Sequence, residues 1–259
     1  VGSEMCIRDR YRGFASSINF LTCHDGFSLW DLYSYNEKHN EANGWNNSDG
    51  NDDNRSWNCG AEGETDDPGI QKLRLRMMKN ACMALMCSRG TPMFLSGDEF
   101  GDTRFGNNNP YCQDNAISWL DWKRLDTNRE LYQFFKKMIW FRREHPAIRR
   151  DLARSETGFP AVSLHTDQPW VNPVDRETKA LAVCYAGRTE QGEDLIYLAL
   201  NVYWEEQRFE LPKLPESYEW RCFADTALDG TGQENGSVAI TEYRLHPRSA
   251  AVFVGVRRN

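Results

Sequence analysis

The chain has 259 residues, of which 40% are hydrophobic and 27% charged, and its formal net charge is −7. This length supports one large or two medium domains with real hydrophobic cores. The negative charge argues against a nucleic-acid-binding protein, and no apolar run approaches the roughly 20 residues that a membrane-spanning helix needs. We therefore expect neither nucleic acid nor a membrane as a partner.

The first ten residues lack the apolar segment of a secretory signal peptide. They also lack any periodicity that would tie them to the chain that follows, so residues 1–10 are interpreted as a foreign or artefactual leader. The eight cysteines are scattered, without a Cys-x-x-Cys pair. This spacing argues against a zinc site and favours reduced thiols in a cytoplasmic protein.

The first predicted strand, Ser17–Cys23, is rich in apolar residues without clean alternation, which indicates a parallel strand buried on both faces. It stops abruptly at His24, Asp25 and Gly26. Chemistry in α/β folds is placed at the carboxyl ends of strands, so His24 and Asp25 form the sharpest candidate site. The competing interpretation, favoured for an arbitrary His-Asp pair, is that they only cap the following turn.

A short helix is predicted after this turn, from Ser28 to Tyr35, because Ser28-x-x-Asp31 fits a capping pattern. Residues 36–68 then form a long polar loop, and its aromatic residues Trp45 and Trp57 favour an ordered binding loop over disorder. The spacing of Asp49, Asn51 and Asp53 is similar to that of a calcium loop. The twelfth position is Gly60 instead of glutamate, so no metal site is predicted.

The next helix is predicted between Asp67, a capping residue followed by Pro68, and a stop at Gly90. A second apolar strand, 91–95, leads into the carboxylates Asp98 and Glu99, for which anchoring of the loop is favoured over catalysis. Another polar loop, 102–126, precedes a helix that a capping box at Thr127–Glu130 would open. Alternating strands and helices of this kind predict a parallel sheet with right-handed crossovers.

Beyond about residue 151 the pattern changes to short apolar runs separated by turn residues, which predicts an antiparallel β-sandwich over residues 151–259. The predicted strands are Ala161–His165, Ala180–Tyr185, Leu195–Asn201, Gln207–Leu211, Trp220–Ala224, Ser237–Ile240 and Ala250–Val254.

The two polar loops carry the residue types that bind sugars, since amide and carboxylate groups recognise hydroxyls and aromatic faces stack on pyranose rings. Any single aromatic residue serves packing as readily as binding. The aromatic candidates are Trp30, Tyr35, Trp45, Trp57, Tyr111, Trp119 and Trp122. The polar run from Asn107 to Asn115 is hard to explain as packing and includes Asn107, Asn108, Asp114 and Asn115.

These motifs resemble the α-amylase superfamily, glycoside hydrolase family 13. Residues 17–27, Ser-Ile-Asn-Phe-Leu-Thr-Cys-His-Asp-Gly-Phe, are similar to its fourth signature region, and residues 90–101 are similar to the region at its eighth barrel strand. Residues 38–44, 54–60, 62–68, 106–115 and 119–122 resemble its isoamylase and glycogen-debranching branch.

The resemblance implies the C-terminal part of a (β/α)8 barrel, with strands seven and eight and their helices over residues 11–150, followed by the β-sandwich. It implies a retaining glycosidase that hydrolyses α-1,6 branch points of glycogen, amylopectin or limit dextrin, without a cofactor. By position, Asp25 resembles the carboxylate that stabilises the transition state, and His24 resembles a substrate-binding histidine. Trp45, Asn107, Asn108, Asp114 and Asn115 are further substrate-binding candidates.

The chain departs from the family because no motif for the nucleophile or the general acid is found in it. A retaining glycosidase needs both of these carboxylates, about 5 Å apart. We therefore expect a C-terminal fragment that is inactive alone and whose partner is the missing N-terminal part of the barrel. The alternatives are an α-1,4 amylase, a maltooligosyltrehalose hydrolase or a branching enzyme, a non-catalytic glycan-binding module, or a half barrel that a partner completes.

Overall fold

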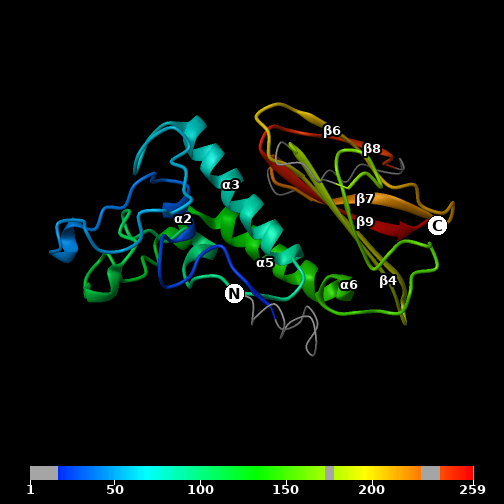
Figure 1. Cartoon of the computed structure of the whole chain (residues 1–259), viewed down its shortest axis with the longest axis horizontal. Coiled ribbons are helices and arrows are strands. Elements are labelled where there is room, and N and C mark those ends of the chain that lie inside the picture. Colours follow the sequence, from blue (N-terminus) through cyan, green and yellow to red (C-terminus); the bar gives the residue numbers. More distant parts are fainter. Residues whose placement is uncertain (1–16, 173–177, 229–239, 259) are drawn as a thin grey trace. The chain divides into compact units, whose positions relative to one another are not determined.

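The computed structural model describes residues 17–172, 178–228 and 240–258 (Figure 1). The residues interpreted as a leader, 1–10, lie outside this range. Contacts divide the described chain into two compact units. One, the loop unit, contains residues 17–86 and 90–138, and the other, the β unit, contains residues 87–89 and those from 139 onward.

The loop unit is built around one parallel strand pair, in which Ile18 of the first strand lies opposite Thr91 of the second. Long helices and irregular loops follow each strand, as the alternating pattern predicted. In chain order its elements are β1 (Ile18–Asn19), α2 (Leu29–Leu32), η3 (Glu41–Asn43), α3 (Pro68–Cys87), β2 (Thr91–Pro92), η4 (Asp98–Phe100), η5 (Pro110–Cys112), α4 (Arg124–Thr127) and α5 (Arg129–Glu144).

Helix starts in this unit follow local capping chemistry in two places and depart from it in a third. Ser28 caps α2 through its side chain, and Asp67 accepts hydrogen bonds from the N–H groups of the first turn of α3. The prediction of a capping box at Thr127–Glu130 is wrong. Thr127 ends α4 instead, and the carboxylate of Glu130 pairs with the buried ammonium of Lys79.

The first predicted strand is shorter and less buried than the sequence indicated. Only Ile18–Asn19 is extended and paired, and the side chains of Phe20 and Leu21 are 53% and 49% exposed. The prediction that this strand is buried on both faces is wrong. In the described part of the chain β1 belongs to a sheet of two strands, β1 and β2, so few neighbouring strands cover it.

The β unit contains a five-stranded antiparallel sheet in the order β3-β4-β5-β9-β7 and an antiparallel pair, β6-β8 (Figure 1). Tyr197, Trp220 and Phe253 of the larger sheet share one buried core with Phe209 and Leu245 of the pair. The predicted antiparallel β architecture is confirmed. The strands are β3 (Val162–His165), β4 (Ala180–Thr189), β5 (Gly192–Asn201), β6 (Gln207–Glu210), β7 (Tyr218–Asp225), β8 (Glu242–Leu245) and β9 (Ser249–Arg257).

One strand was not predicted, and one predicted strand is not tested by the structure. The pattern did not indicate β8, which is four residues long and has the charged Glu242 and Arg244 at two of them. The predicted strand Ser237–Ile240 lies outside the described residues except for Ile240.

The last turns of α5 and the short helix α6 (Pro146–Arg149) belong to the β unit. The ring of Phe141 lies 4.6 Å from that of Phe223 on β7, and the carboxylate of Asp194 on β5 accepts a hydrogen bond from the Ala147 N–H at 2.8 Å. These contacts place the division between the compact units at residue 138, inside α5. A domain boundary near residue 150 stays a prediction.

No helix among the residues described by the structure has the length and apolar character needed to cross a membrane. Seven cysteines lie in the described part of the chain, and the structure gives no disulfide bond between them.

Candidate active site

The His24–Asp25 turn lies four residues beyond the end of β1 and exposes both functional side chains. The imidazole and carboxylate are 85% and 82% exposed, and His24 Nε2 lies 3.4 Å from Asp25 Oδ2. The backbone of the turn is fixed by hydrogen bonds. The Gly26 N–H donates to the carbonyl of Asn108 at 3.0 Å, and Gly26 adopts a φ of 96°, which favours glycine. The turn therefore presents a carboxylate to solvent on an ordered main chain.

Asp98 is a buried anchor beneath this turn. Its carboxylate accepts hydrogen bonds from the Thr22 hydroxyl, the Leu29 N–H at 2.8 Å and the Leu95 N–H at 3.0 Å. It thereby joins the segment that follows β1, the start of α2 and the turn after β2. Burial raises the pKa of Asp98 to about 6, and these hydrogen bonds partly offset the effect. The anchoring role favoured for this residue is confirmed by its contacts.

Asp31, in α2, is a second buried acid, and it joins this helix to the loop after η4. Its buried carboxylate accepts hydrogen bonds from the Thr103 hydroxyl and from the Arg104 N–H at 2.8 Å. Burial raises its pKa to about 6, against the opposing effect of these hydrogen bonds. Sequence reasoning used Asp31 only as part of a capping pattern. Its position between Trp30 and Leu32, an acid within an apolar run, is the signal that indicates a buried partner.

We predict that these two carboxyls make the chain more stable at pH 5 than at pH 7. An unfolded Asp has a pKa of 3.8, so the folded state retains these protons to a higher pH than the unfolded state does. Their contribution to the free energy of unfolding therefore falls as the pH rises from about 4 to about 6. Between pH 5 and pH 7 the expected change is about 1 kcal/mol for each carboxyl.

Urea unfolding of the parent chain and of Asp31→Asn and Asp98→Asn, at pH 5, 6 and 7, measures this effect. Each substitution should reduce the pH dependence, whatever its effect at a single pH. The exposed Asp53→Asn is the matched control and should leave the pH dependence unchanged. A pH dependence that neither buried substitution alters would contradict the prediction.

An asparagine network joins the two polar loops. Asn108 Oδ1 accepts a hydrogen bond from Asn40 Nδ2 at 2.8 Å, and its amide group donates to the Asn54 side chain at 2.6 Å. Asn107 Nδ2 donates to Asn43 Oδ1 at 2.9 Å. A Cβ at Gly50 would lie 2.3 Å from Asn108 Oδ1, so glycine is needed there. The predicted ordered loop is thus built from side-chain amides.

Two of the predicted substrate-binding residues, Asn107 and Asn108, are buried in this network. Two others are exposed. Asp114 accepts a hydrogen bond from the indole N–H of Trp119 at 3.0 Å, and Asn115 donates to the Gln113 side chain at 2.8 Å. The contacts give Asn107 and Asn108 a role in joining the loops, and sugar binding by all four residues stays a prediction.

Aromatic side chains project from these loops into solvent. Trp45, Tyr111, Trp119 and Trp122 are each at least 59% exposed. The segments that carry Trp45 and Tyr111 are tied together, because Gln113 Nε2 donates to the Ala42 carbonyl at 2.9 Å. By contrast, Tyr35 is buried, and the guanidinium of Arg124 lies 4.3 Å from the Trp30 ring.

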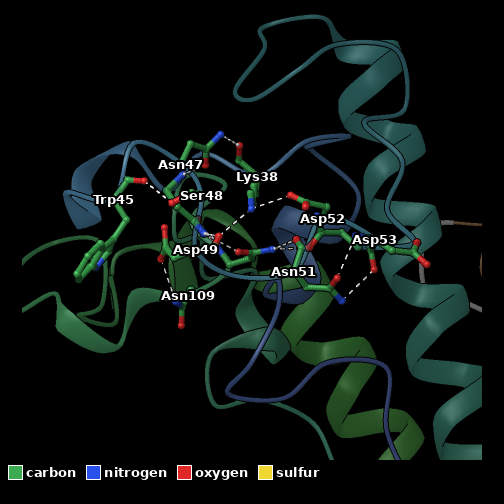
Figure 2. Close-up of polar contacts among 12 residues, drawn as sticks. Lys38, Trp45, Asn47, Ser48, Asp49, Asn51, Asp52, Asp53 and Asn109 are labelled. Carbon is green, nitrogen blue, oxygen red and sulfur yellow. Dashed lines mark hydrogen bonds and ion pairs between the residues drawn. The ribbon is translucent and has the colours of Figure 1, made fainter.

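In the first polar loop, the carboxylates of Asp49, Asp52 and Asp53 contact different partners (Figure 2). Lys38 Nζ donates to the Asp49 carbonyl at 2.8 Å and pairs with Asp52 at 2.7 Å, whereas Asp53 pairs with Arg55. Asp49 Oδ2 accepts the amide of Asn109 at 2.9 Å. Among the described residues no group of three or more His, Cys, Asp or Glu side chains could hold a metal ion.

Comparison with known proteins gives a consistent set of relatives, although no protein-family model matches the chain. It is 42% identical to a glycogen operon protein GlgX homolog of Mycobacterium bovis, over 92% of this chain and 36% of that protein. It is also 42% identical to the chloroplastic isoamylase 3 of Oryza sativa, over 91% of this chain and 30% of the relative. The chain spans about a third of the length of these curated relatives.

Among solved structures, a pullulanase from Bacillus acidopullulyticus matches with a TM-score of 0.63 and 19% identity, over 93% of this chain and 24% of that structure. A pullulanase from Anoxybacillus complexed with maltotetraose matches with a TM-score of 0.61 and 18% identity, over 98% of this chain and 30% of that structure. At these identities the likeness concerns the fold.

Proposed function

Because the chain belongs to the isoamylase and glycogen-debranching branch of the α-amylase superfamily, we propose that it is the C-terminal portion of a retaining α-glucan hydrolase. The reaction is hydrolysis of α-1,6 branch points in glycogen, amylopectin or limit dextrin. The observation that carries the proposal is the 42% identity to both a glycogen operon protein and an isoamylase over more than nine-tenths of the chain. The glycogen-operon relative also supports a cytoplasmic location.

In this proposal β1 and β2 are the last two strands of a (β/α)8 barrel. Only the C-terminal part of that barrel is in this chain, over residues 11–150, and it precedes the sandwich of residues 151–259. The parallel pairing of β1 with β2 across helix α3 supports it. So does the exposure of Ile18, Phe20 and Leu21, since apolar side chains on an edge strand and just after it are suited to be covered by further parts of a barrel. The N-terminal part of the barrel is then the partner of this chain.

The proposed chemistry divides three carboxylates between the two parts. The N-terminal part supplies the nucleophile and the general acid, and Asp25 stabilises the positive charge that develops on the sugar ring in the transition state. His24 donates a hydrogen bond to a hydroxyl of the same sugar. Trp45, Asp114 and Asn115 line the path of the glucan, and the buried Asn107 and Asn108 act in binding by holding together the loops that carry these residues. The exposed carboxylate of Asp25, on a main chain held by hydrogen bonds, supports its assignment.

We expect the purified 259-residue chain to release no reducing ends from glycogen or a branched dextrin. Co-expression with the N-terminal two-thirds of the Mycobacterium bovis relative should restore hydrolysis, and linkage analysis should show loss of α-1,6 bonds. Hydrolysis by the chain alone that Asp25→Asn abolishes would contradict the division of carboxylates. Loss of α-1,4 bonds would instead favour an amylase.

A second candidate is a glycan-binding module without catalysis, favoured by the four exposed aromatic side chains of the loop unit. Affinity electrophoresis in glycogen separates the two. Strong retardation of the chain, together with failure of co-expression to produce hydrolysis, would favour the binding module.

A further inference from the structure

The His24–Asp25 turn has a second main-chain contact, which comes from the loop after β2. Arg104 Nη1 donates a hydrogen bond to the His24 carbonyl at 3.3 Å. The Gly26 N–H donates to the Asn108 carbonyl, so the backbone is held by a hydrogen bond at the residue before Asp25 and at the residue after it. Both bonds are made to segment 104–108, so the place of the turn depends on the conformation of that segment.

The conformation of Arg104 is itself set by a buried acid. Its N–H donates to Asp31 Oδ2 at 2.8 Å, and the neighbouring Thr103 hydroxyl binds the same carboxylate. Thr103 Oγ1 also accepts the N–H of Phe105 at 3.0 Å, and Phe105 adopts a φ of 55°. A left-handed conformation at a non-glycine residue is held only where its surroundings determine it. Asp31 and Thr103 provide those surroundings.

We propose that Arg104 is a positioning residue for Asp25, oriented by Asp31 and acting through the His24 carbonyl. The proposal rests on the function proposed above. The imidazole and carboxylate of the turn are more than four-fifths exposed, so backbone contacts have to set where Asp25 lies. A displacement of about 1 Å in a catalytic group costs roughly a hundredfold in rate, which makes a single such contact measurable.

The Arg104 side chain is only partly buried, so its truncation tests positioning without removing a core residue. In the co-expressed complete enzyme we expect Arg104→Ala to lower kcat by about tenfold to a hundredfold. The KM for a branched dextrin should change by less than about threefold and the melting temperature should stay the same, since the effect falls on the transition state. Arg104→Lys, which keeps a donor, should recover part of the activity.

Arg55→Ala is the matched control, because this arginine is 86% exposed and pairs with the exposed Asp53. It should leave kcat unchanged. Equal activity of Arg104→Ala and the control would overturn the proposal. So would a loss of activity that accompanies an equal fall in melting temperature and is not recovered by Arg104→Lys.

Hydrogen exchange on the isolated 259-residue chain separates this proposal from the proposed function, because it needs no catalysis. In Arg104→Ala the amide of Gly26 should exchange faster than in the parent, while amides of α3 should be unaffected. Unchanged exchange at Gly26 would overturn the positioning role even in an active enzyme. Faster exchange in a complete enzyme that does not cleave glucan would count against the proposed function alone.

Discussion

On the proposed function, Asp25→Asn is expected to lower kcat of the complete enzyme by roughly a thousandfold, the scale on which a preorganised transition-state group acts. The substitution keeps the shape of the side chain and removes its negative charge, which the developing positive charge on the sugar needs. The ground state of the sugar carries no such charge, so KM should change much less than kcat. Because the Asp25 side chain is 82% exposed, its replacement should not affect folding.

Steady-state kinetics on a branched dextrin, with the chain co-expressed with the N-terminal part, measures the effect. Asp53→Asn provides a control, since this carboxylate is also on an exposed loop and pairs with Arg55. A fall in kcat of less than about tenfold for Asp25→Asn would show that Asp25 is not a catalytic residue.

Asp98→Ala is expected to destabilise the loop unit by about 3 to 5 kcal/mol. It leaves the N–H groups of Leu29 and Leu95 without the acceptor that they use in the parent. Removal of a buried charge offsets part of this cost, which sets the lower end of the range. Asp98→Asn should lower the stability less, by about 1 to 3 kcal/mol. The amide oxygen of asparagine can still accept a hydrogen bond from one backbone N–H group, whereas its NH2 group faces the other one and cannot accept.

The free energy of unfolding in urea at pH 7, followed by tryptophan fluorescence, gives this order directly. Asp53→Ala serves as the exposed control and should change the stability by less than about 0.5 kcal/mol. An Asn variant less stable than the Ala variant would show that the hydrogen bonds to Asp98 are not what stabilises the junction.

Local signals in the sequence predicted the parts of the fold that local chemistry determines. Ser28 and Asp67 cap helices because the N–H groups that they accept lie two or three residues away. The strands of the β unit other than β8 were predicted because burial of one core requires apolar side chains at regular spacing. The His24–Asp25 turn was predicted because polar residues end an apolar run.

The parts that were missed depend on contacts between distant segments. A capping box was predicted at Glu130, but its partner is Lys79, 51 residues away. Asp31 and Arg104 carry no pattern that links them, and their contact spans 73 residues. The exposure of Phe20 and Leu21 could not be predicted either, because it depends on which strands lie beside β1 and not on its own composition.

The order in which the chain folds follows from the anchor at Asp98. Its hydrogen bonds with Leu29 and Thr22 close loops of 69 and 76 residues, and the loss of chain entropy in such closures slows the formation of distant contacts. Helix α3 lies inside these loops and needs only local hydrogen bonds, so it can form before they close. The turn that carries Asp25 therefore acquires its final geometry late. A probe placed in this turn should report a slow refolding step, whereas a probe in α3 should report a faster one.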